Sequence, residues 1–261
     1  MAPLIDPHFN LDGNHHSVPK FYLRQWANKN QLVKVETIED SRISFKSPHS
    51  LTSLRNFYTA TFSDGRRDSS AEHIMSLLEN DACRVINNLN DRPVAWPLND
   101  YDRGKLCAFT AYQATRVSKY RSALVATLQH RALALGLNLE PEAIDDTNLH
   151  IQGIAAVSDS YTLDLMHQDM GIFVCPENLL ITSDNPVIRN LAYPDTSRPL
   201  STAFPLRATL IPLSPTTLLV FFGDERVNCD KPFHLSEEAA IHLNELQRIN
   251  AASALYLVSD A

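Results

Sequence analysis

The feature that most constrains the fold is a run of apolar residues at helical spacing in the middle of the chain. Over residues 102–135, five positions repeat on one side of a helix: Leu106, Phe109, Val117, Tyr120 and Leu124. This pattern predicts a long central helix. Further helices are predicted over residues 69–89, where Ser69 and Glu72 form a capping-box pattern, and over residues 147–167.

Short apolar or β-branched runs, separated by turn-forming residues, predict strands at both ends of the chain. In the N-terminal third they cover residues 32–38, 42–45 and 56–62, and the first two form a hairpin. In the C-terminal third they cover residues 172–175, 179–182, 209–211, 217–222 and 255–258, with a helix that starts at a Ser236 cap. The expected fold is α+β. A helical core with a long central helix packs against short, mostly antiparallel strands from both thirds, and the end strands share one sheet.

The organisation along the chain indicates one domain. Residues 1–14 are expected to be a flexible arm and residues 15–261 a single α+β domain, because no repeat, low-complexity stretch or long linker interrupts them. No apolar run approaches the roughly 18 residues needed to cross a bilayer, and the N-terminus lacks the features of a signal peptide. We therefore expect a cytoplasmic protein that does not interact with membranes.

The amino-acid composition argues against several classes of function. A net charge of −7 argues against binding along an extended nucleic-acid duplex, although a local basic pocket would be compatible with it. The chain has only 7 glycines and contains neither GxxxxGKS/T nor GxGxxG, which disfavours a P-loop or a Rossmann phosphate site. The 4 cysteines form no CxxC pair and are interpreted as reduced core residues.

Two polar residues interrupt the apolar stripe of the central helix. Gln113 lies seven residues after Leu106 and four after Phe109, so its amide is expected to be buried. Arg116 follows at the edge of the same stripe, and Glu79 on the preceding helix is its candidate partner. Such groups either form an internal polar network or bind a ligand, and the sequence favours neither. Asn250 in the last helix predicts another buried amide.

Other candidate residues lie next to element ends. His16 precedes a short helix expected to begin at Pro19, where a ring nitrogen can face a pocket, and Arg24 lies on the same helix. Asp184 and Asn185 follow an apolar strand, a common position for a general base or a metal ligand. A structural role is the competing interpretation for each: a loop histidine, a solvated arginine and an ordinary Asp-Asn-Pro turn.

The same residues carry a resemblance to a known family. Residues 16–26, His-Ser-Val-Pro-Lys-Phe-Tyr-Leu-Arg-Gln-Trp, resemble the opening signature of the family named domain of unknown function 4238. Similar landmarks follow in order: Asn56-Phe57-Tyr58, Glu79, Gln113 with Arg116, residues 182–186 (Thr-Ser-Asp-Asn-Pro), residues 212–215 and Asn244. The resemblance runs from about His15 to Val258. Trp26 stands where the family usually has phenylalanine, and the resemblance implies no particular reaction.

Two functions fit these residues. The first is a hydrolase, similar to a nuclease or phosphodiesterase, acting on a nucleotide, a nucleic-acid end or another anionic substrate. In it His16, Asp184 and Glu79 are catalytic, a divalent metal is an option, and the substrate is bound by Arg24, Gln113, Arg116 and Asn185. The alternative is a non-catalytic ligand-binding or regulatory module whose polar pocket holds a small anion or nucleotide. The sequence identifies no cofactor and no oligomeric state.

Overall fold

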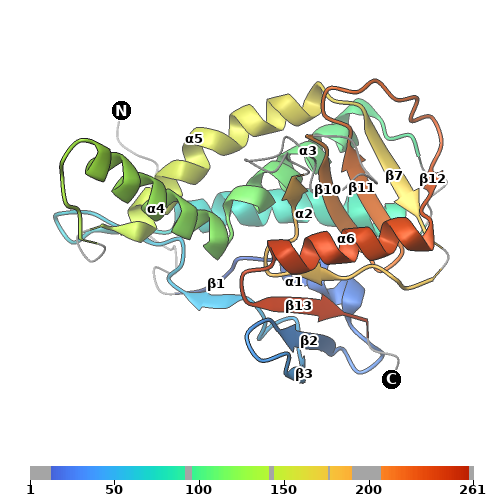
Figure 1. The fold of residues 1–261 in the computed structure, drawn as a ribbon, viewed down its shortest axis with the longest axis horizontal. Helices are drawn as coiled ribbons and strands as arrows, with labels where there is room; N and C mark the ends of the chain where they lie inside the picture. The colour runs from blue at the N-terminus through green and yellow to red at the C-terminus, as the bar shows by residue number, and fades with distance from the viewer. Residues whose placement is uncertain (1–12, 92–95, 141–143, 176, 190–206, 259–261) are drawn as a thin grey trace.

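A computed structural model describes residues 13–91, 96–140, 144–175, 177–189 and 207–258. Its helices are α1 (Lys20–Leu23), the 3-10 helix η1 (Arg24–Trp26), α2 (Ser70–Asp91), α3 (Asp100–Thr115), α4 (Ser118–Ala134), α5 (Asp146–Met166) and α6 (Glu237–Asn250). Figure 1 shows α2, α3 and α5 running together, with the strands gathered at one end and below α6. The fold is α+β, as the sequence predicts. No helix in the described ranges is long and apolar enough to cross a membrane.

Two sheets contain most of the strands. The larger has the order β12 (Phe233–His234), β7 (Met170–Val174), β11 (Thr217–Phe221), β10 (Thr209–Ser214) and β9 (Ile188–Arg189). The smaller has the order β3 (Ile43–Lys46), β2 (Val33–Thr37), β13 (Ala254–Leu257) and β8 (Thr182–Ser183). Strands from the two ends of the chain therefore share a sheet, which confirms that expectation.

Two small ribbons complete the strand set. They pair β1 (Asn14–His16) with β4 (Ser53–Arg55), and β5 (Ala60–Thr61) with β6 (Arg67–Asp68). The strand predicted over residues 56–62 is wrong in its extent, because Asn56 adopts a left-handed backbone conformation (φ 54°) that ends β4. The arm expected over residues 1–14 falls on residues 1–12, which lie outside the described ranges, whereas Asn14 already pairs with Arg55.

The predicted central helix is divided into α3 and α4 in the structure. Arg116 ends α3, and Val117 is extended (φ −85°, ψ 157°). Two side chains from elsewhere in the chain bind the last carbonyl groups of α3. The Tyr58 hydroxyl donates to the Arg116 carbonyl at 2.6 Å, and His150 Nε2 lies 2.8 Å from the Thr115 carbonyl. These contacts satisfy carbonyls that a continuing helix would have bonded, so the chain can turn here.

Helix α2 buries one face and exposes the other. Ile74 is 49% exposed, and the buried residues of α2 are Met75, Ala82, Val85, Ile86 and Leu89. All of these except Met75 contribute to the main apolar core together with Tyr22 and Trp26 from the N-terminal helical turns, and Met75 belongs to a smaller cluster around Tyr58. Tyr22 contacts Thr182 and Pro212 through its hydroxyl, and Trp26 Nε1 donates to the Leu180 carbonyl at 3.0 Å. These bonds fix α1 and η1 against both sheets.

Candidate functional site

A buried guanidinium forms the centre of the predicted polar network. Arg116 is 2% exposed, and its Nη1 lies 2.7 Å from Glu79 Oε1. Nη2 donates to the His16 carbonyl at 2.5 Å, and Nε lies 3.5 Å from the Tyr58 hydroxyl. The structure thus brings Arg116, Glu79 and the backbone of His16 together. The contacts occupy each guanidinium nitrogen, as burial of a charge requires.

Gln113, one turn earlier on α3, also binds a backbone carbonyl group. Its side chain is buried, as predicted, and Nε2 donates to the Ser17 carbonyl at 2.9 Å. The buried Oε1 has no hydrogen-bond partner among the described residues. Gln113 and Arg116 therefore bind two successive carbonyl groups, those of Ser17 and His16, and fix the segment that joins β1 to α1.

The His16 ring is held on the other side of that segment. It is 7% exposed, and its Nε2 lies 3.3 Å from the His49 carbonyl, which can only accept a hydrogen bond. Desolvation lowers the pKa of His16, with the nearby Lys20 ammonium acting in the same direction. The imidazole is therefore neutral at neutral pH, with a proton on Nε2 and a lone pair on Nδ1.

A hollow of about 360 Å³ lies on the outer side of the same segment. We call it the Tyr256 hollow. Its wall includes Ser17, which Gln113 binds, and Ser118, two residues after Arg116, so the buried network lies behind the wall. The full lining is Ser17, Val35, Thr37, Arg42, Lys46, Ser50, Leu51, Thr52, Ser53, Leu54, Ser118, Asp184, Ser253, Ala254 and Tyr256. Most of these side chains carry a hydroxyl group or a charge.

Tyr256 is the least exposed polar side chain that lines the hollow. It is 2% exposed and lies in the middle of the smaller sheet, opposite Val35 on one side and Thr182 on the other. Its hydroxyl forms no hydrogen bond with a described residue. Burial, and secondarily the Asp184 carboxylate, raise the pKa of this phenol. Tyr256 is therefore a neutral group that can still donate to, or accept from, an incoming molecule.

Comparison with known proteins decides the family. The model of the family described as "Protein of unknown function (DUF4238)" matches residues 14–260. The chain belongs to the DUF4238 family. Neither the curated proteins nor the solved structures give a match. The family description names no reaction, so the chemistry of this DUF4238 protein has to be argued from its own side chains.

Asp184 of the DUF4238 chain lines the hollow, but its carboxylate is already engaged. Oδ1 accepts from the Ala252 amide at 2.8 Å, and Oδ2 accepts from the Ser253 amide at 2.8 Å and the Ser253 hydroxyl at 2.6 Å. Three donors therefore occupy the oxygen atoms of this carboxylate. The arrangement ties the loop after β8 to the start of β13.

Asn185 makes a similar connection to α6. Its Nδ2 donates to the Asn250 carbonyl at 3.0 Å, and Asn250 Nδ2 donates back to the Asn185 carbonyl at 2.8 Å. Asn250 is only half-buried, so the prediction of a buried amide there is wrong. The fully buried amide of α6 is Gln247, which bonds Ser183 Oγ at 2.9 Å and the Pro186 carbonyl at 2.7 Å.

Substituting Asp184→Asn should lower the free energy of unfolding by about 2 kcal/mol, because hydrogen bonds to a charged acceptor contribute roughly 1.5–3 kcal/mol. The amide also places a donor opposite a donor. Urea unfolding followed by tryptophan fluorescence measures the change. Asp81→Asn is the matched control, since its pair with Arg84 is largely exposed and should change stability by less than about 0.5 kcal/mol. Equal stability of Asp184→Asn and wild type would contradict this account.

Among the described residues, neither Arg24 nor a metal site is part of the polar network around Arg116. Arg24 lies in η1 with an exposed side chain and forms no ion pair with a described residue, so the structure does not bring it to Arg116 or to Asp184. Glu79 and Asp184, both catalytic residues in the hydrolase hypothesis, belong to separate polar networks. Within the described ranges, no group of three or more His, Cys, Asp and Glu side chains is arranged to hold a metal ion.

The sequence predicted only a capping role for Glu72, and the structure shows a second feature of this residue. Oε2 of Glu72 is buried without a hydrogen-bond partner among the described residues. Desolvation raises its pKa to about 7, opposed by the charge of Arg116 and assisted by that of Glu79. The spacing of seven residues between Glu72 and Glu79 places both carboxylates on one face of α2. This spacing is the sequence signal that could have indicated an interaction between them. Tyr256 was also missed, because nothing in a short apolar strand marks an unpaired hydroxyl.

Proposed function

We propose that this protein is a non-catalytic binding module that takes up a small anionic ligand in the Tyr256 hollow. The observation that carries the proposal is the Tyr256 side chain, which lines the polar hollow and whose hydroxyl forms no hydrogen bond with a described residue. A ligand oxygen can bond this hydroxyl, and a hydrogen bond of this kind contributes roughly 0.5–1.5 kcal/mol.

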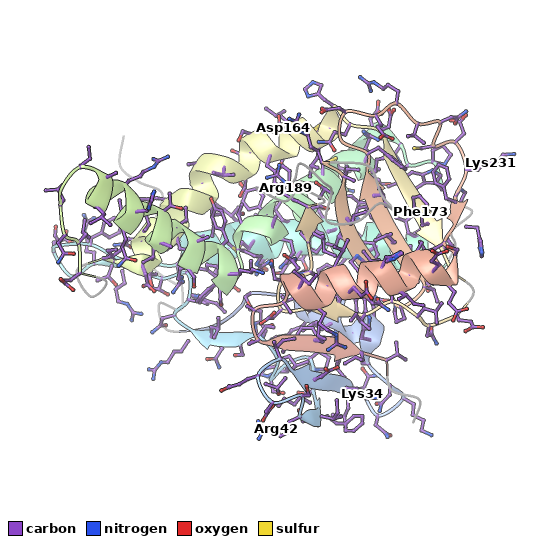
Figure 2. All side chains as sticks on the ribbon, viewed as in Figure 1. Lys34, Arg42, Asp164, Phe173, Arg189 and Lys231 are labelled. Atoms are coloured by element: carbon purple, nitrogen blue, oxygen red, sulfur yellow. The ribbon has the colours of Figure 1, made fainter. Side chains whose placement is uncertain are left out.

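The charge at the rim favours an anion. Arg42 lies in the β2–β3 hairpin, at the foot of the molecule in Figure 2, and Lys46 is the last residue of β3. The nearest carboxylate to Arg42 is Asp40, at 3.8 Å, and both side chains are mostly exposed. Such a pair is worth little, so the guanidinium can turn to a ligand at small cost. Lys46 forms no ion pair with a described residue.

The lining also supports binding over turnover. Among the described lining residues there is no histidine, cysteine or glutamate, and the one carboxylate, Asp184, is occupied by three donors. A general base needs a free lone pair within hydrogen-bond reach of the reacting group. The hollow offers hydroxyl groups and two cations, which suit recognition of an anion.

Thermal-shift screening and calorimetry with inorganic phosphate, citrate and nucleoside monophosphates test the proposal. A bound anion should raise the melting temperature of the wild type. Tyr256→Phe should weaken binding about 3- to 10-fold, the equivalent of one hydrogen bond, and Arg42→Ala with Lys46→Ala should weaken it further. Arg66→Ala is the control, because Arg66 forms an exposed turn pair with Asp64 similar to that of Arg42 with Asp40. Unchanged affinity in the Arg42 and Lys46 double variant would refute the proposal.

A hydrolase is the second candidate, and one observation favours it. The neutral His16 imidazole and the Glu72 carboxyl, with its pKa of about 7, lie in the electrostatic surroundings of Glu79 and Lys20, a pairing suited to acid–base chemistry. Turnover of pooled nucleotides and oligonucleotides should then fall in His16→Ala and in Glu72→Gln, with and without added Mg²⁺. Equal turnover in all three proteins would exclude this candidate.

A further inference from the structure

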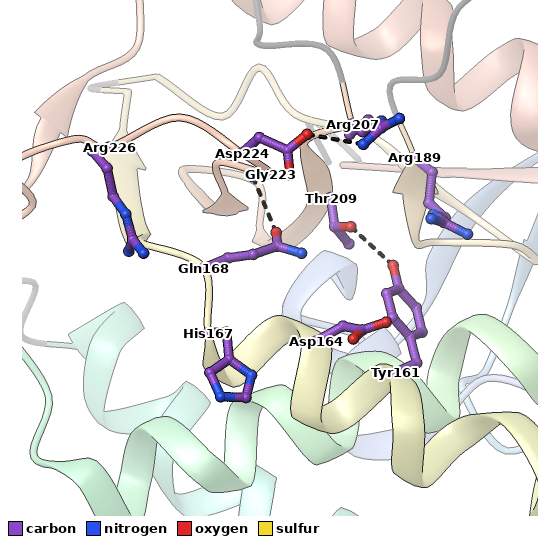
Figure 3. Close-up of a pocket in the computed structure, with 10 residues that line it drawn as sticks. All are labelled: Tyr161, Asp164, His167, Gln168, Arg189, Arg207, Thr209, Gly223, Asp224 and Arg226. Atoms are coloured by element: carbon purple, nitrogen blue, oxygen red, sulfur yellow. Dashed lines mark hydrogen bonds and ion pairs between the residues drawn. The ribbon is translucent and has the colours of Figure 1, made fainter.

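A second polar hollow, of about 400 Å³, lies between the end of α5 and the larger sheet. We call it the arginine hollow, and Figure 3 shows its side chains. They come from α5, from the β9–β10 edge and from the turn that follows β11. The lining is Tyr161, Asp164, His167, Gln168, Arg189, Arg207, Thr209, Gly223, Asp224 and Arg226. None of these residues lines the Tyr256 hollow.

Tyr161 forms part of one wall of the arginine hollow and contacts both Thr209 and Arg189. Its hydroxyl lies 2.8 Å from Thr209 Oγ1, and both groups are buried. Arg189 is directly opposite Thr209 in the β9–β10 pairing, so the two side chains share one face of the sheet. The Arg189 guanidinium lies over the Tyr161 ring at 5.2 Å from its centroid. It forms no ion pair or hydrogen bond with a described residue, so its donors are positioned by an aromatic ring and left unused.

Two further guanidinium groups face the same space. Arg207 pairs with Asp224 at 2.9 Å, and Arg226 lies 3.4 Å from Asp169. All but Asp169 are largely exposed, so these pairs are weak and leave most of the guanidinium donors free. Figure 3 shows Arg226 across the hollow from Arg189 and Arg207. Arginine side chains therefore line the hollow on two sides.

Asp164 adds a hydrogen-bond acceptor to a hollow that is otherwise rich in donors. It lies one turn after Tyr161 on α5, lines the hollow, and forms no ion pair or hydrogen bond with a described residue. A carboxylate cannot bind phosphate, but it accepts hydrogen bonds from hydroxyl groups. Three arginines beside a free carboxylate therefore fit a molecule that carries both a phosphate and hydroxyl groups.

We propose that the arginine hollow is a binding site for a phosphorylated polyol, either a sugar phosphate or a nucleotide. The guanidinium groups bind the phosphate through charge-assisted hydrogen bonds, and Asp164 binds the hydroxyls of the sugar. The volume of about 400 Å³ is within the range of small-molecule sites. This site does not depend on the function proposed for the Tyr256 hollow.

Calorimetry on the full chain at low salt tests the site with four probes: glucose 6-phosphate, AMP, inorganic phosphate and glucose. Both phosphorylated polyols should bind, inorganic phosphate should bind more weakly, and glucose should not bind. Measured in the Arg42→Ala, Lys46→Ala background, which removes binding at the Tyr256 hollow, Arg189→Met should weaken binding of all three phosphates at least 10-fold. Asp164→Asn should weaken binding of the polyol phosphates several-fold and leave inorganic phosphate unchanged.

Two controls make the outcomes decisive. Arg84→Met removes an exposed arginine of α2 and should change no affinity, and the Arg42→Ala, Lys46→Ala variant should bind these probes at the arginine hollow as wild type does. Because Arg189 is exposed, Arg189→Met should keep the wild-type melting temperature, and Arg226→Met provides a second variant. Tighter binding of AMP identifies a nucleotide site, and tighter binding of glucose 6-phosphate a sugar-phosphate site. Equal affinity in wild type and Arg189→Met, or no binding of either polyol phosphate, would overturn the proposal.

Discussion

Replacing Arg116 by methionine is expected to lower the free energy of unfolding by about 3–5 kcal/mol, the range for breaking a buried ion pair by removing one partner. The substitution leaves Glu79 without its cation and the His16 carbonyl without its donor. It also removes the guanidinium that lies 5.7 Å from the centroid of the Tyr58 ring. The loss should be larger than that from any exposed arginine, because Arg116 is buried and each of its nitrogens is bonded.

Urea unfolding of the single and double variants measures the effect. A double-mutant cycle of Arg116→Met with Glu79→Gln isolates the energy of the ion pair from that of the bond to His16. The Glu79 side chain is 23% exposed, so Glu79→Gln should cost less than Arg116→Met. Arg84→Met, which breaks an exposed pair, is the control. A loss below about 1 kcal/mol in Arg116→Met would show that the network does not hold the β1–α1 segment.

Replacing Glu72 by glutamine is expected to stabilise the protein at pH 8 and to leave its stability unchanged near pH 4.5. The pKa of Glu72 in the folded state, about 7, is above the ordinary value of 4.5. A group with a raised folded pKa contributes stability that is present below its unfolded pKa and is lost as the pH rises through the folded pKa. Ionisation of Glu72 should therefore destabilise the fold between about pH 4.5 and pH 7, and glutamine does not ionise.

The size of this effect follows from the shift in pKa. One unit corresponds to about 1.4 kcal/mol, and after allowing for the partial exposure of Glu72 we expect a gain of about 2 kcal/mol at pH 8. Chemical denaturation of both proteins at pH 4.5, 6 and 8 measures it. Glu245→Gln, on the exposed face of α6, is the control and should follow the wild-type pH profile. A Glu72→Gln variant that loses stability at pH 8 would show that the carboxylate is paired in solution.

The elements that follow local patterns were predictable from the sequence. The capping signals gave α2 and the Ser236 start of α6, where the Ser236 side chain accepts from the Ala239 amide at 3.2 Å. Helical spacing also identified Gln113 as a buried polar residue of α3 and placed Arg116 at the edge of its buried stripe. These predictions succeed because hydrophobic periodicity within one helix decides which of its residues face the core.

Features that depend on distant residues were not predictable. The break after α3 is made by Tyr58 and His150, which reach the helix end from 58 and 35 residues away. Asp184 resembled an accessible base because the donors that occupy it, at Ala252 and Ser253, lie 68 and 69 residues further along the chain. No sequence pattern predicts the arginine hollow, because Arg189, Arg207 and Arg226 belong to different segments that meet only in the fold.

The position of β13 sets the order in which the protein can be assembled. This strand lies between β2 and β8, and Tyr256 is the cross-strand partner of Val35. During synthesis on the ribosome, the β2–β3 hairpin has no neighbour on that side until residue 257 has emerged. The walls of the Tyr256 hollow therefore come together only after residue 257 has been translated, and one edge of the hairpin stays unpaired until then.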